Sequence, residues 1–131
     1  MKKLILASIL TLLSTSAFAE WTYVGDADDY SLTMYANLAT IRKNGHMVKM
    51  WDLSDYKTTI GFSDGKSKLS SKSQVEYDCK EERSRGLALI DTSGHMGEGD
   101  VVFNSSNVQN WSPVSPDSIG ETLWKIACGK Q

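Results

Sequence analysis

The sequence predicts an α+β domain, in which an antiparallel sheet of about six strands carries one C-terminal helix. Three observations predict this fold. Between residues 21 and 103, short apolar runs alternate with turns rich in Gly, Asn, Asp and Ser, as in antiparallel proteins. Only residues 118–129 show helical spacing between a capping residue and a glycine. The two cysteines, Cys79 and Cys128, fall at the end of a predicted strand and at the end of that helix, so a disulfide would tie the helix to the sheet.

The composition is that of an ordinary globular protein. The chain has 131 residues, is 40% hydrophobic and 23% charged, and carries a net charge of -2. This excludes wholesale disorder, a collagen-like repeat and a disulfide-dense miniprotein. An acidic balance gives no general attraction to nucleic acid, so we expect no nucleic-acid partner.

The N-terminus has the pattern of a bacterial secretory signal peptide. Lys2 and Lys3 precede the apolar run Leu4–Leu13, and Ala17-Phe18-Ala19 matches a signal peptidase site. The alternative, a transmembrane anchor, needs about 20 apolar residues, which is twice the length of this run. We therefore expect residues 1–19 to be removed and residues 20–131 to form the domain.

Cleavage at this site predicts where the mature protein goes. Loss of two lysines takes the net charge from -2 to -4. No cysteine lies near the cut, so we expect no lipid anchor. The mature chain is expected to be exported to the periplasm or the cell surface.

The first half of the domain is expected to form strands and one tight hairpin. Trp21–Val24 and Ser31–Ala36 are β-prone or alternating runs. Leu38–Lys43 and Met47–Tyr56 flank Asn44-Gly45, and Asn-Gly between apolar runs is a strong hairpin signal. Both turn positions of such a hairpin need positive φ, which Asn and Gly adopt readily.

The segment Lys57–Lys72 is expected to be a polar, basic and mobile connection. It contains four lysines, two glycines and several serines against a single aspartate. One reading is a solvated loop; the other is a docking site for an acidic partner or a polyanionic sugar. Lys66, Lys68 and Lys72 are therefore candidate ligand-binding residues.

Three further strands are expected after this connection. Ser73–Cys79 alternates, with Val75, Tyr77 and Cys79 on one face. Leu87–Ile90 and Val101–Phe103 follow, and the Gly-rich residues 93–99 between them are read as a hairpin loop. No Lys-Ser/Thr and no helix follow these glycines, so they do not form a phosphate-binding loop.

The last segment is the single predicted helix. Ser118 and Glu121 form a capping box, and Gly129 is a natural stop. Between them lies an apolar stripe that can pack on the sheet, made of Ile119, Leu123, Trp124, Ala127 and Cys128.

The two cysteines suit an oxidising compartment, and two allow only one pairing. Closing a loop of about 50 residues would stabilise the fold by roughly 4 kcal/mol in the chain-entropy model. The alternatives are a redox pair or half of a metal site. The sequence has no C-x-x-C, and neither histidine lies at ligand spacing from Cys79 or Cys128.

Catalytic motifs are missing from the sequence, so we expect no enzyme and no cofactor. Neither G-x-S-x-G nor the full S-x-x-K framework is present. Glu76 and Asp78 lie on one strand face and could act as a carboxylate pair. The competing interpretation is that they form ion pairs with Arg83, Arg85 or a neighbouring lysine.

One pair of soft ligands remains. His95 and Met96 are adjacent in the Gly-rich link and could coordinate haem iron or copper. The competing interpretation is a coincidence at a loop tip.

Taken together, these residues resemble the surface-adhesin protein E family of Gram-negative bacteria. The segments that carry the resemblance are Trp21–Gly25, Met50–Tyr56, Glu76–Cys79 with Arg83 and Arg85, Trp111–Pro116, and Glu121, Leu123, Trp124, Lys125 and Cys128. Their order and spacing cover nearly the whole mature region.

The resemblance implies six antiparallel strands, a C-terminal helix and one strand-to-helix disulfide. It also implies an adhesin that binds host matrix and plasma proteins, and haem. We therefore expect an exported, non-enzymatic binding module whose partner is an extracellular host protein or an envelope component. The alternative expectation is a periplasmic carrier of a small ligand or of haem.

Overall fold

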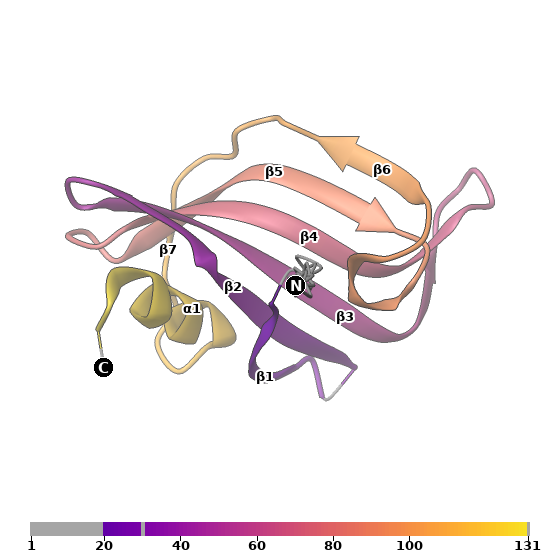
Figure 1. The fold of residues 1–131 in the computed structure, drawn as a ribbon, viewed down its shortest axis with the longest axis horizontal. Helices are drawn as coiled ribbons and strands as arrows, with labels where there is room; N and C mark the ends of the chain where they lie inside the picture. The colour runs from indigo at the N-terminus through magenta and orange to yellow at the C-terminus, as the bar shows by residue number, and fades with distance from the viewer. Residues whose placement is uncertain (1–19, 30, 131) are drawn as a thin grey trace, which may run out of the picture.

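The computed structural model describes residues 20–29 and 31–130, and the predicted signal peptide lies outside these residues (Figure 1). The elements are β1 (Thr22–Ala27), β2 (Leu32–Asn44), β3 (Met47–Gly61), β4 (Ser67–Asp78), β5 (Arg83–Thr92), the 3-10 turn η1 (His95–Gly97), β6 (Val101–Ser105), β7 (Ser112–Pro113) and α1 (Ile119–Cys128).

The strands form one antiparallel sheet in the order β1-β2-β3-β4-β5-β6, so each strand pairs with its neighbour in sequence. The two-residue strand β7 lies off this path and pairs with the start of β5. Helix α1 lies on one side of the sheet (Figure 1). The predicted α+β fold is confirmed, with a sheet of seven strands when β7 is included.

The predicted hairpin after β2 is confirmed, but its turn is shifted by one residue. Asn44 pairs with Met47, so the loop residues are Gly45 and His46. Gly45 has φ +63°, whereas Asn44 is not left-handed. Glycine at the first loop position is the requirement of a type II′ turn, so the second position needs no special residue.

The predicted runs Ser31–Ala36 and Leu38–Lys43 fall in one strand, β2, which begins at Leu32. The register with β3 breaks between Asn37 and Arg42. Within the break, Thr40 Oγ1 accepts a hydrogen bond of 2.9 Å from the backbone N–H of Trp51. A side chain replaces a ladder bond here, so the strand bulges without ending.

The prediction of a mobile connection over Lys57–Lys72 is also wrong. β3 continues to Gly61 and β4 begins at Ser67, so only residues 62–66 connect them. Phe62 N–H donates to Lys66 O at 2.7 Å, and Gly65 has φ +85°. Polar side chains are compatible with this hairpin because residues 57–61 are exposed and extend beyond the core.

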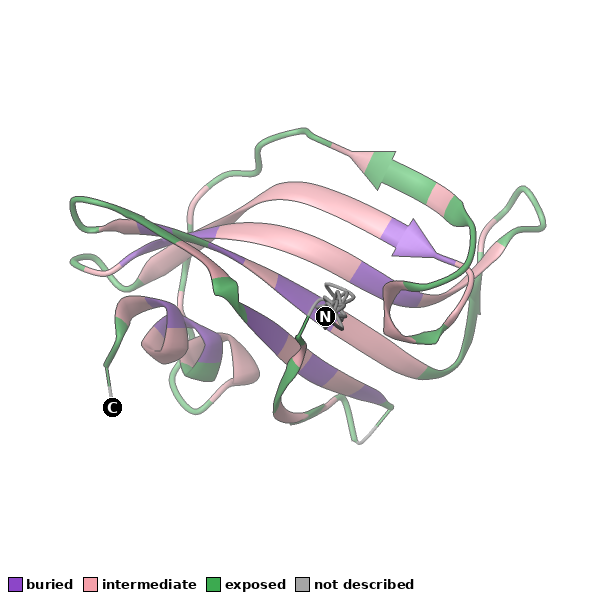
Figure 2. Ribbon diagram, viewed as in Figure 1, coloured by how far each residue is buried: buried purple, intermediate pink, exposed green. Residues whose placement is uncertain are grey.

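Helix α1 covers part of one face of the sheet, which we call the helix face. Directly paired residues of antiparallel strands share a face. Ala36, Asp52, Ser73, Leu89 and Ser105 form one row across the helix face, from β2 to β6. Buried residues concentrate on β2–β4 and α1 (Figure 2). The core contains Leu32, Met34, Ala36, Val48, Met50, Tyr77, Leu123, Trp124 and Ala127.

The other side of the sheet is the opposite face. Tyr35, Leu53, Lys72, Ile90 and Asn104 form the row there. Leu53 is fully buried on this face, where the loop at η1 packs over the strands, and a Cβ on Gly97 would lie 3.2 Å from its side chain. The two faces therefore have different covers: a helix on one and a short loop on the other.

Helix α1 begins and ends as the sequence predicts. Ser118 Oγ accepts a hydrogen bond of 3.1 Å from the Glu121 N–H, and Gly129 is left-handed at φ +66°. The helix packs on β1 to β4. Ten residues span about 15 Å, whereas six strands about 4.8 Å apart form a wider sheet, so one helix leaves part of the face uncovered. No helix in residues 20–29 and 31–130 is long and apolar enough to cross a membrane.

The predicted disulfide is confirmed. Cys79 follows β4 directly, Cys128 ends α1, and their Cα atoms are 5.6 Å apart. The Cys79 N–H also donates to His46 O at 2.8 Å, which joins the strand end to the first hairpin. The redox-pair and metal-site alternatives for these cysteines are not needed, because each cysteine is already bonded to the other.

Candidate functional site

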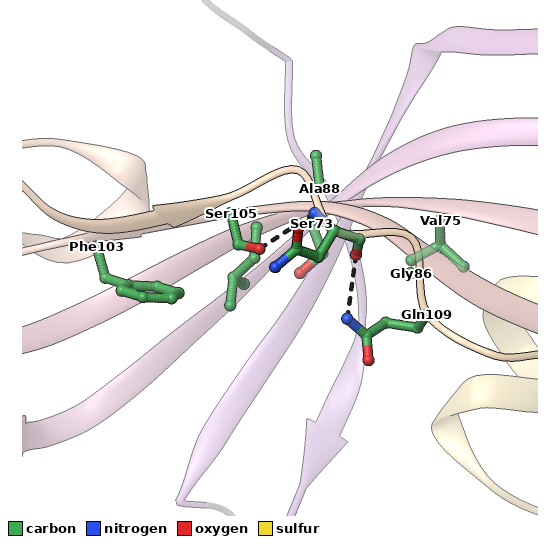
Figure 3. A pocket seen from close by; sticks show the side chains of 9 residues that line it. Ser73, Val75, Gly86, Ala88, Phe103, Ser105 and Gln109 are labelled. Carbon is green, nitrogen blue, oxygen red and sulfur yellow. Dashed lines mark hydrogen bonds between the residues drawn. The ribbon is translucent and has the colours of Figure 1, made fainter.

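The uncovered part of the helix face contains a hollow of about 460 Å³ (Figure 3). We call it the β4–β6 hollow. The residues that line it are Ser73, Val75, Gly86, Ala88, Leu89, Phe103, Ser105, Asn107 and Gln109. Its volume falls in the range of about 300–1,000 Å³ that is typical of small-molecule sites.

The hollow exists because the outer edge of β5 is paired only at its two ends. β6 pairs with Leu89–Thr92, and β7 pairs with Arg83 and Ser84. Between these contacts, residues 106–111 leave the sheet and form a wall. One backbone hydrogen bond, from Gln109 N–H to Gly86 O at 2.8 Å, holds this wall to β5.

Two hydrogen bonds hold the side chains of Ser105 and Gln109 to the backbone of Asn107 (Figure 3). The Asn107 N–H donates to Ser105 Oγ at 3.2 Å, and Gln109 Nε2 donates to the Asn107 carbonyl oxygen at 3.1 Å. A Cβ on Gly86 would lie 3.3 Å from Gln109 Cγ, so glycine permits the close approach of this side chain.

A buried carboxyl group lies one strand from the hollow. Asp52 pairs with Ser73 across β3 and β4 and is only 5% exposed. Burial raises the pKa of the Asp52 carboxyl to about 7. Burial and the charge of Asp52 together raise the pKa of the Tyr77 hydroxyl, which stays neutral at physiological pH. The Asp52 carboxyl group, one strand from the hollow, therefore changes its charge near neutral pH.

The outer strand β6 is exposed and uncharged. Its side chains Val101 and Phe103 are 56% and 50% exposed, and Val108 in the following wall is 58% exposed. The sequence Val-Val-Phe-Asn-Ser contains no charge and no proline. Charged side chains and proline usually protect an edge strand from pairing with other chains, and β6 has neither.

The three candidate lysines do not meet on one surface. Lys66 lies in the exposed β3–β4 turn. Lys68 reaches Asp91 at 3.2 Å and sits over the Tyr56 ring at 5.3 Å, with its side chain only 15% exposed. Lys72 lies on the opposite face, where it lines a hollow of about 220 Å³ with Trp51.

His95 and Met96 lie in η1, over the opposite face. Asp55 Oδ1 accepts a hydrogen bond of 2.9 Å from the Met96 N–H and lies 3.1 Å from His95 Nδ1. The His95 side chain is 52% exposed. Among the described residues there is no group of three or more His, Cys, Asp or Glu side chains that could hold a metal ion.

Glu76 and Asp78 form ion pairs with the predicted arginines. Arg85 Nη2 lies 2.7 Å from Glu76 Oε1, and Arg83 Nε lies 3.0 Å from Asp78 Oδ2. Burial alone would raise the pKa of Asp78. The hydrogen bonds from Arg83, Glu81 and Lys80 and the charge of Arg83 outweigh burial and lower this pKa. A carboxylate held ionised in this way is a poor general acid.

Both arginines also stack on one aromatic ring. The guanidinium carbons of Arg83 and Arg85 each lie 4.5 Å from the centre of the Trp111 ring. This ring immediately precedes β7, so the two cation–π contacts hold the end of the wall against β5.

Several site residues have no individual signal in the sequence. Phe103, Asn107 and Gln109 meet only because residues 106–111 fold back along β5. Asp52 does have a signal, since it is an acid within the apolar run Met50–Leu53. Tyr77 and Trp124 are core residues, whereas Trp51 is half-buried on the opposite face.

The arrangement is suited to binding. Its hollow is lined by hydroxyl, amide and apolar groups, none of which titrates as a general acid or base near neutral pH. The nearby carboxylates of Glu76, Asp78 and Asp91 are each paired with a cation.

Comparison with known proteins agrees with this geometry. The family model described as surface-adhesin protein E matches residues 21–129. No protein among the curated ones matches the sequence.

Solved structures of Haemophilus influenzae protein E have the same fold. Its crystal form II superposes with a TM-score of 0.63 at 10% identity, covering 82% of this chain and 87% of that chain. Protein E from non-typeable Haemophilus influenzae superposes with a TM-score of 0.58 at 11% identity, covering 86% of this chain and 76% of that chain. At this identity the likeness shows the fold alone.

Proposed function

Since this chain belongs to the surface-adhesin protein E family, we propose that it is an exported, non-enzymatic adhesin whose partners are extracellular host proteins of the matrix or plasma. The family assignment supports an adhesin-like binding protein at the cell surface. The choice of host proteins as partners is the finer part of the proposal.

The observation that carries the proposal is the open edge of β6. The sheet ends at this strand, and both Val101 and Phe103 expose about half of their surface. An unpaired edge presents a row of backbone donors and acceptors, to which an extended segment of a partner can add as a further strand.

Contacts on both sides of the edge would give such a complex specificity. Val101 pairs with Thr92, on the opposite face, whereas Phe103 pairs with Asp91, on the helix face. An added strand would therefore meet one apolar side chain on each face. Backbone hydrogen bonds supply affinity in this mode of recognition, and side chains select the partner.

Binding to immobilised matrix and plasma proteins tests the proposal. We expect saturable binding to at least one of them, and a loss of about tenfold in Val101→Lys, because a lysine on an edge strand opposes strand addition. Leu38→Lys is the matched control, since Leu38 is also an exposed apolar residue, at 46%, but lies in the β2 bulge.

Two results would contradict the proposal. If wild-type protein binds no host protein more strongly than an unrelated control protein does, the adhesin function is ruled out. Equal loss in both lysine variants removes β6 as the binding edge. Self-association that is abolished by Val101→Lys, without host binding, would instead make a second copy the occupant of this edge.

Localisation is tested on the native host. We expect an N-terminus at Glu20 by mass spectrometry and removal of the protein by protease added to whole cells. Protein that is confined to the periplasm and protected from protease would contradict host binding and would favour an envelope component as partner.

We propose haem as a second ligand, on the basis of His95. Its ring is exposed, and Asp55 Oδ1 lies 3.1 Å from Nδ1. A carboxylate at Nδ1 orients a histidine whose Nε2 serves as a ligand. The site fits one axial ligand to haem iron. Titration with haem should shift the Soret band, and His95→Ala should weaken the shift, whereas His46→Ala should not. No shift at micromolar haem would exclude this ligand.

A further inference from the structure

The β4–β6 hollow has the properties of a small-ligand site, and the addition of a partner strand at the edge of β6 would not use it. It lies on the helix face beside β6, and residues 106–111 rather than a second helix form its outer wall. The wall contacts β5 through one backbone hydrogen bond, at Gly86, and through the Trp111 ring farther along. It is held in place, but it does not fill the space behind it.

The lining carries no formal charge. None of its nine residues is Asp, Glu, Lys, Arg or His. Two acids lie beside the lining on this face. Asp91 is bonded to Lys68 Nζ and Ser71 Oγ, and the buried Asp52, which pairs with Ser73, would repel an anion when ionised. An ionised ligand would lose its hydration without gaining a counter-charge, which is unfavourable. The hollow therefore selects an uncharged ligand.

The polar groups of the hollow offer both donors and acceptors. Gln109 Nε2 is held by the Asn107 carbonyl oxygen, which leaves Gln109 Oε1 as an acceptor. The Asn107 side-chain amide and the Ser73 hydroxyl have no hydrogen bond to another residue in the part of the chain that the structure describes. A ligand with several hydroxyl groups can use all three, and little reorganisation is required because the wall is already bonded.

The apolar groups complete the chemistry. Val75 and Leu89 contribute apolar side chains to the lining. The Phe103 ring, 50% exposed, stands at one end of the hollow (Figure 3). The face of an aromatic ring is electron-rich, so it attracts C–H groups that carry partial positive charge. A pyranose ring has such C–H groups on its face and hydroxyl groups around its edge.

We propose that the β4–β6 hollow binds a neutral saccharide, with its ring against Phe103 and its hydroxyl groups bonded to Ser73, Asn107 and Gln109. This is a ligand beyond the host proteins proposed above. It uses the helix face behind β6, whereas partner proteins add at the outer edge of β6.

NMR titration with galactose, N-acetylglucosamine and maltose tests the proposal, with glucuronate and N-acetylneuraminate as anionic counterparts. We expect saturable shifts at millimolar neutral sugar, confined to β4, β5 and residues 103–109. The anionic sugars should bind at least about fivefold more weakly, because they bring an unpaired charge.

Variants assign the contacts. Gln109→Ala and Phe103→Leu should each weaken binding by about fivefold, the size expected for one hydrogen bond or one ring contact. Asn110→Ala is the matched control, since Asn110 is an exposed amide next to Gln109 that does not line the hollow. It should leave the dissociation constant within about twofold.

Three outcomes would overturn the proposal: no shifts with any neutral sugar at tens of millimolar, equal effects of Gln109→Ala and Asn110→Ala, or shifts that map to the opposite face. Shifts in the hollow with an alkyl alcohol or a neutral tripeptide, but with no sugar, would also overturn the saccharide proposal. They would identify that class of compound as the ligand of the hollow. Val101→Lys should leave sugar binding unchanged, so failure of this proposal and of the adhesin proposal can be distinguished.

Discussion

The indole Nε1 of Trp124 donates a hydrogen bond of 2.8 Å to the backbone carbonyl oxygen of Asp78, and both residues are buried. Asp78 ends β4, and the next residue, Cys79, carries the disulfide to Cys128. Trp124 and Cys128 lie about one turn apart on α1. The last turn of the helix is therefore held to the end of β4 by a covalent bond and by a buried hydrogen bond.

Removal of the disulfide should destabilise the fold. We expect Cys79→Ser with Cys128→Ser to lower the free energy of unfolding by up to about 4 kcal/mol, because the unfolded chain regains the entropy of a loop with a separation of 49 residues. Urea denaturation measures the change. Coincident unfolding curves for oxidised and reduced wild-type protein would contradict this prediction.

The Trp124 hydrogen bond should make its own contribution. Trp124→Phe keeps an aromatic ring in the core but leaves the buried Asp78 carbonyl without its indole partner, so we expect a loss of about 1–3 kcal/mol. Trp51→Phe serves as the control, since Trp51 is half-buried on the opposite face. Equal losses in the two variants would show that ring size, and not the hydrogen bond, sets the effect.

Asp52 should make stability depend on pH. Its pKa is about 7 in the folded protein against a usual 3.8, so the folded state binds more protons between these values. Stability should therefore fall as the pH rises from 3.8 to about 7, and the contribution of this group is at most about 4 kcal/mol. Asp52→Asn should flatten the fall and raise stability at pH 8. Asp64→Asn, in the exposed β3–β4 turn, should not. An unchanged pH profile in Asp52→Asn would rule this out.

Asp78 should have the opposite dependence on pH. Its folded pKa lies below the usual 3.8, so the stability it contributes is present above 3.8 and is lost as the pH falls through the lowered value. Arg83→Met leaves the buried carboxylate without its cation. We expect this variant to be destabilised at pH 7 and to approach wild type at strongly acidic pH, as measured by urea midpoints. A difference that is constant across pH would contradict the ion-pair explanation.

Trp111 should hold the wall of the hollow through its two arginines. Trp111→Leu removes both cation–π contacts, and we expect it to lower the free energy of unfolding by about 1 kcal/mol and to speed amide exchange of Gln109. Trp111→Phe retains a ring and should show a smaller effect. Unchanged exchange at Gln109 in the leucine variant would mean that the Gly86 hydrogen bond alone holds the wall.

Features that depend on near neighbours were predictable from the sequence. The capping box at Ser118 and Glu121 and the stop at Gly129 act within one turn of helix, and the structure has all of them. The ion pairs of Glu76 and Asp78 were also among the predicted alternatives, because arginines lie a few residues away on the next strand.

Features that depend on polar residues in extended strands were not predictable. Lys57–Lys72 has the composition of a loop, yet most of it belongs to β3 and β4. Where a hairpin extends beyond the core, both of its faces are in solvent, so its strands need no apolar residues. In the first hairpin, the turn moved by one residue because pairing of Asn44 with Met47 placed Gly45 at the position that needs positive φ.

The sequence by itself determined the class of fold, the helix, the disulfide and the resemblance to an adhesin family, because capping, periodicity and cysteine pairing depend on residue type and spacing. Only the tertiary structure decided where the β4–β6 hollow lies. A single helix is narrower than a six-stranded sheet, and the chain from Ser105 to Ser112 returns along β5 without filling the gap. That return alone brings Phe103, Asn107 and Gln109 next to Ser73, which lies at least 30 residues earlier in the chain.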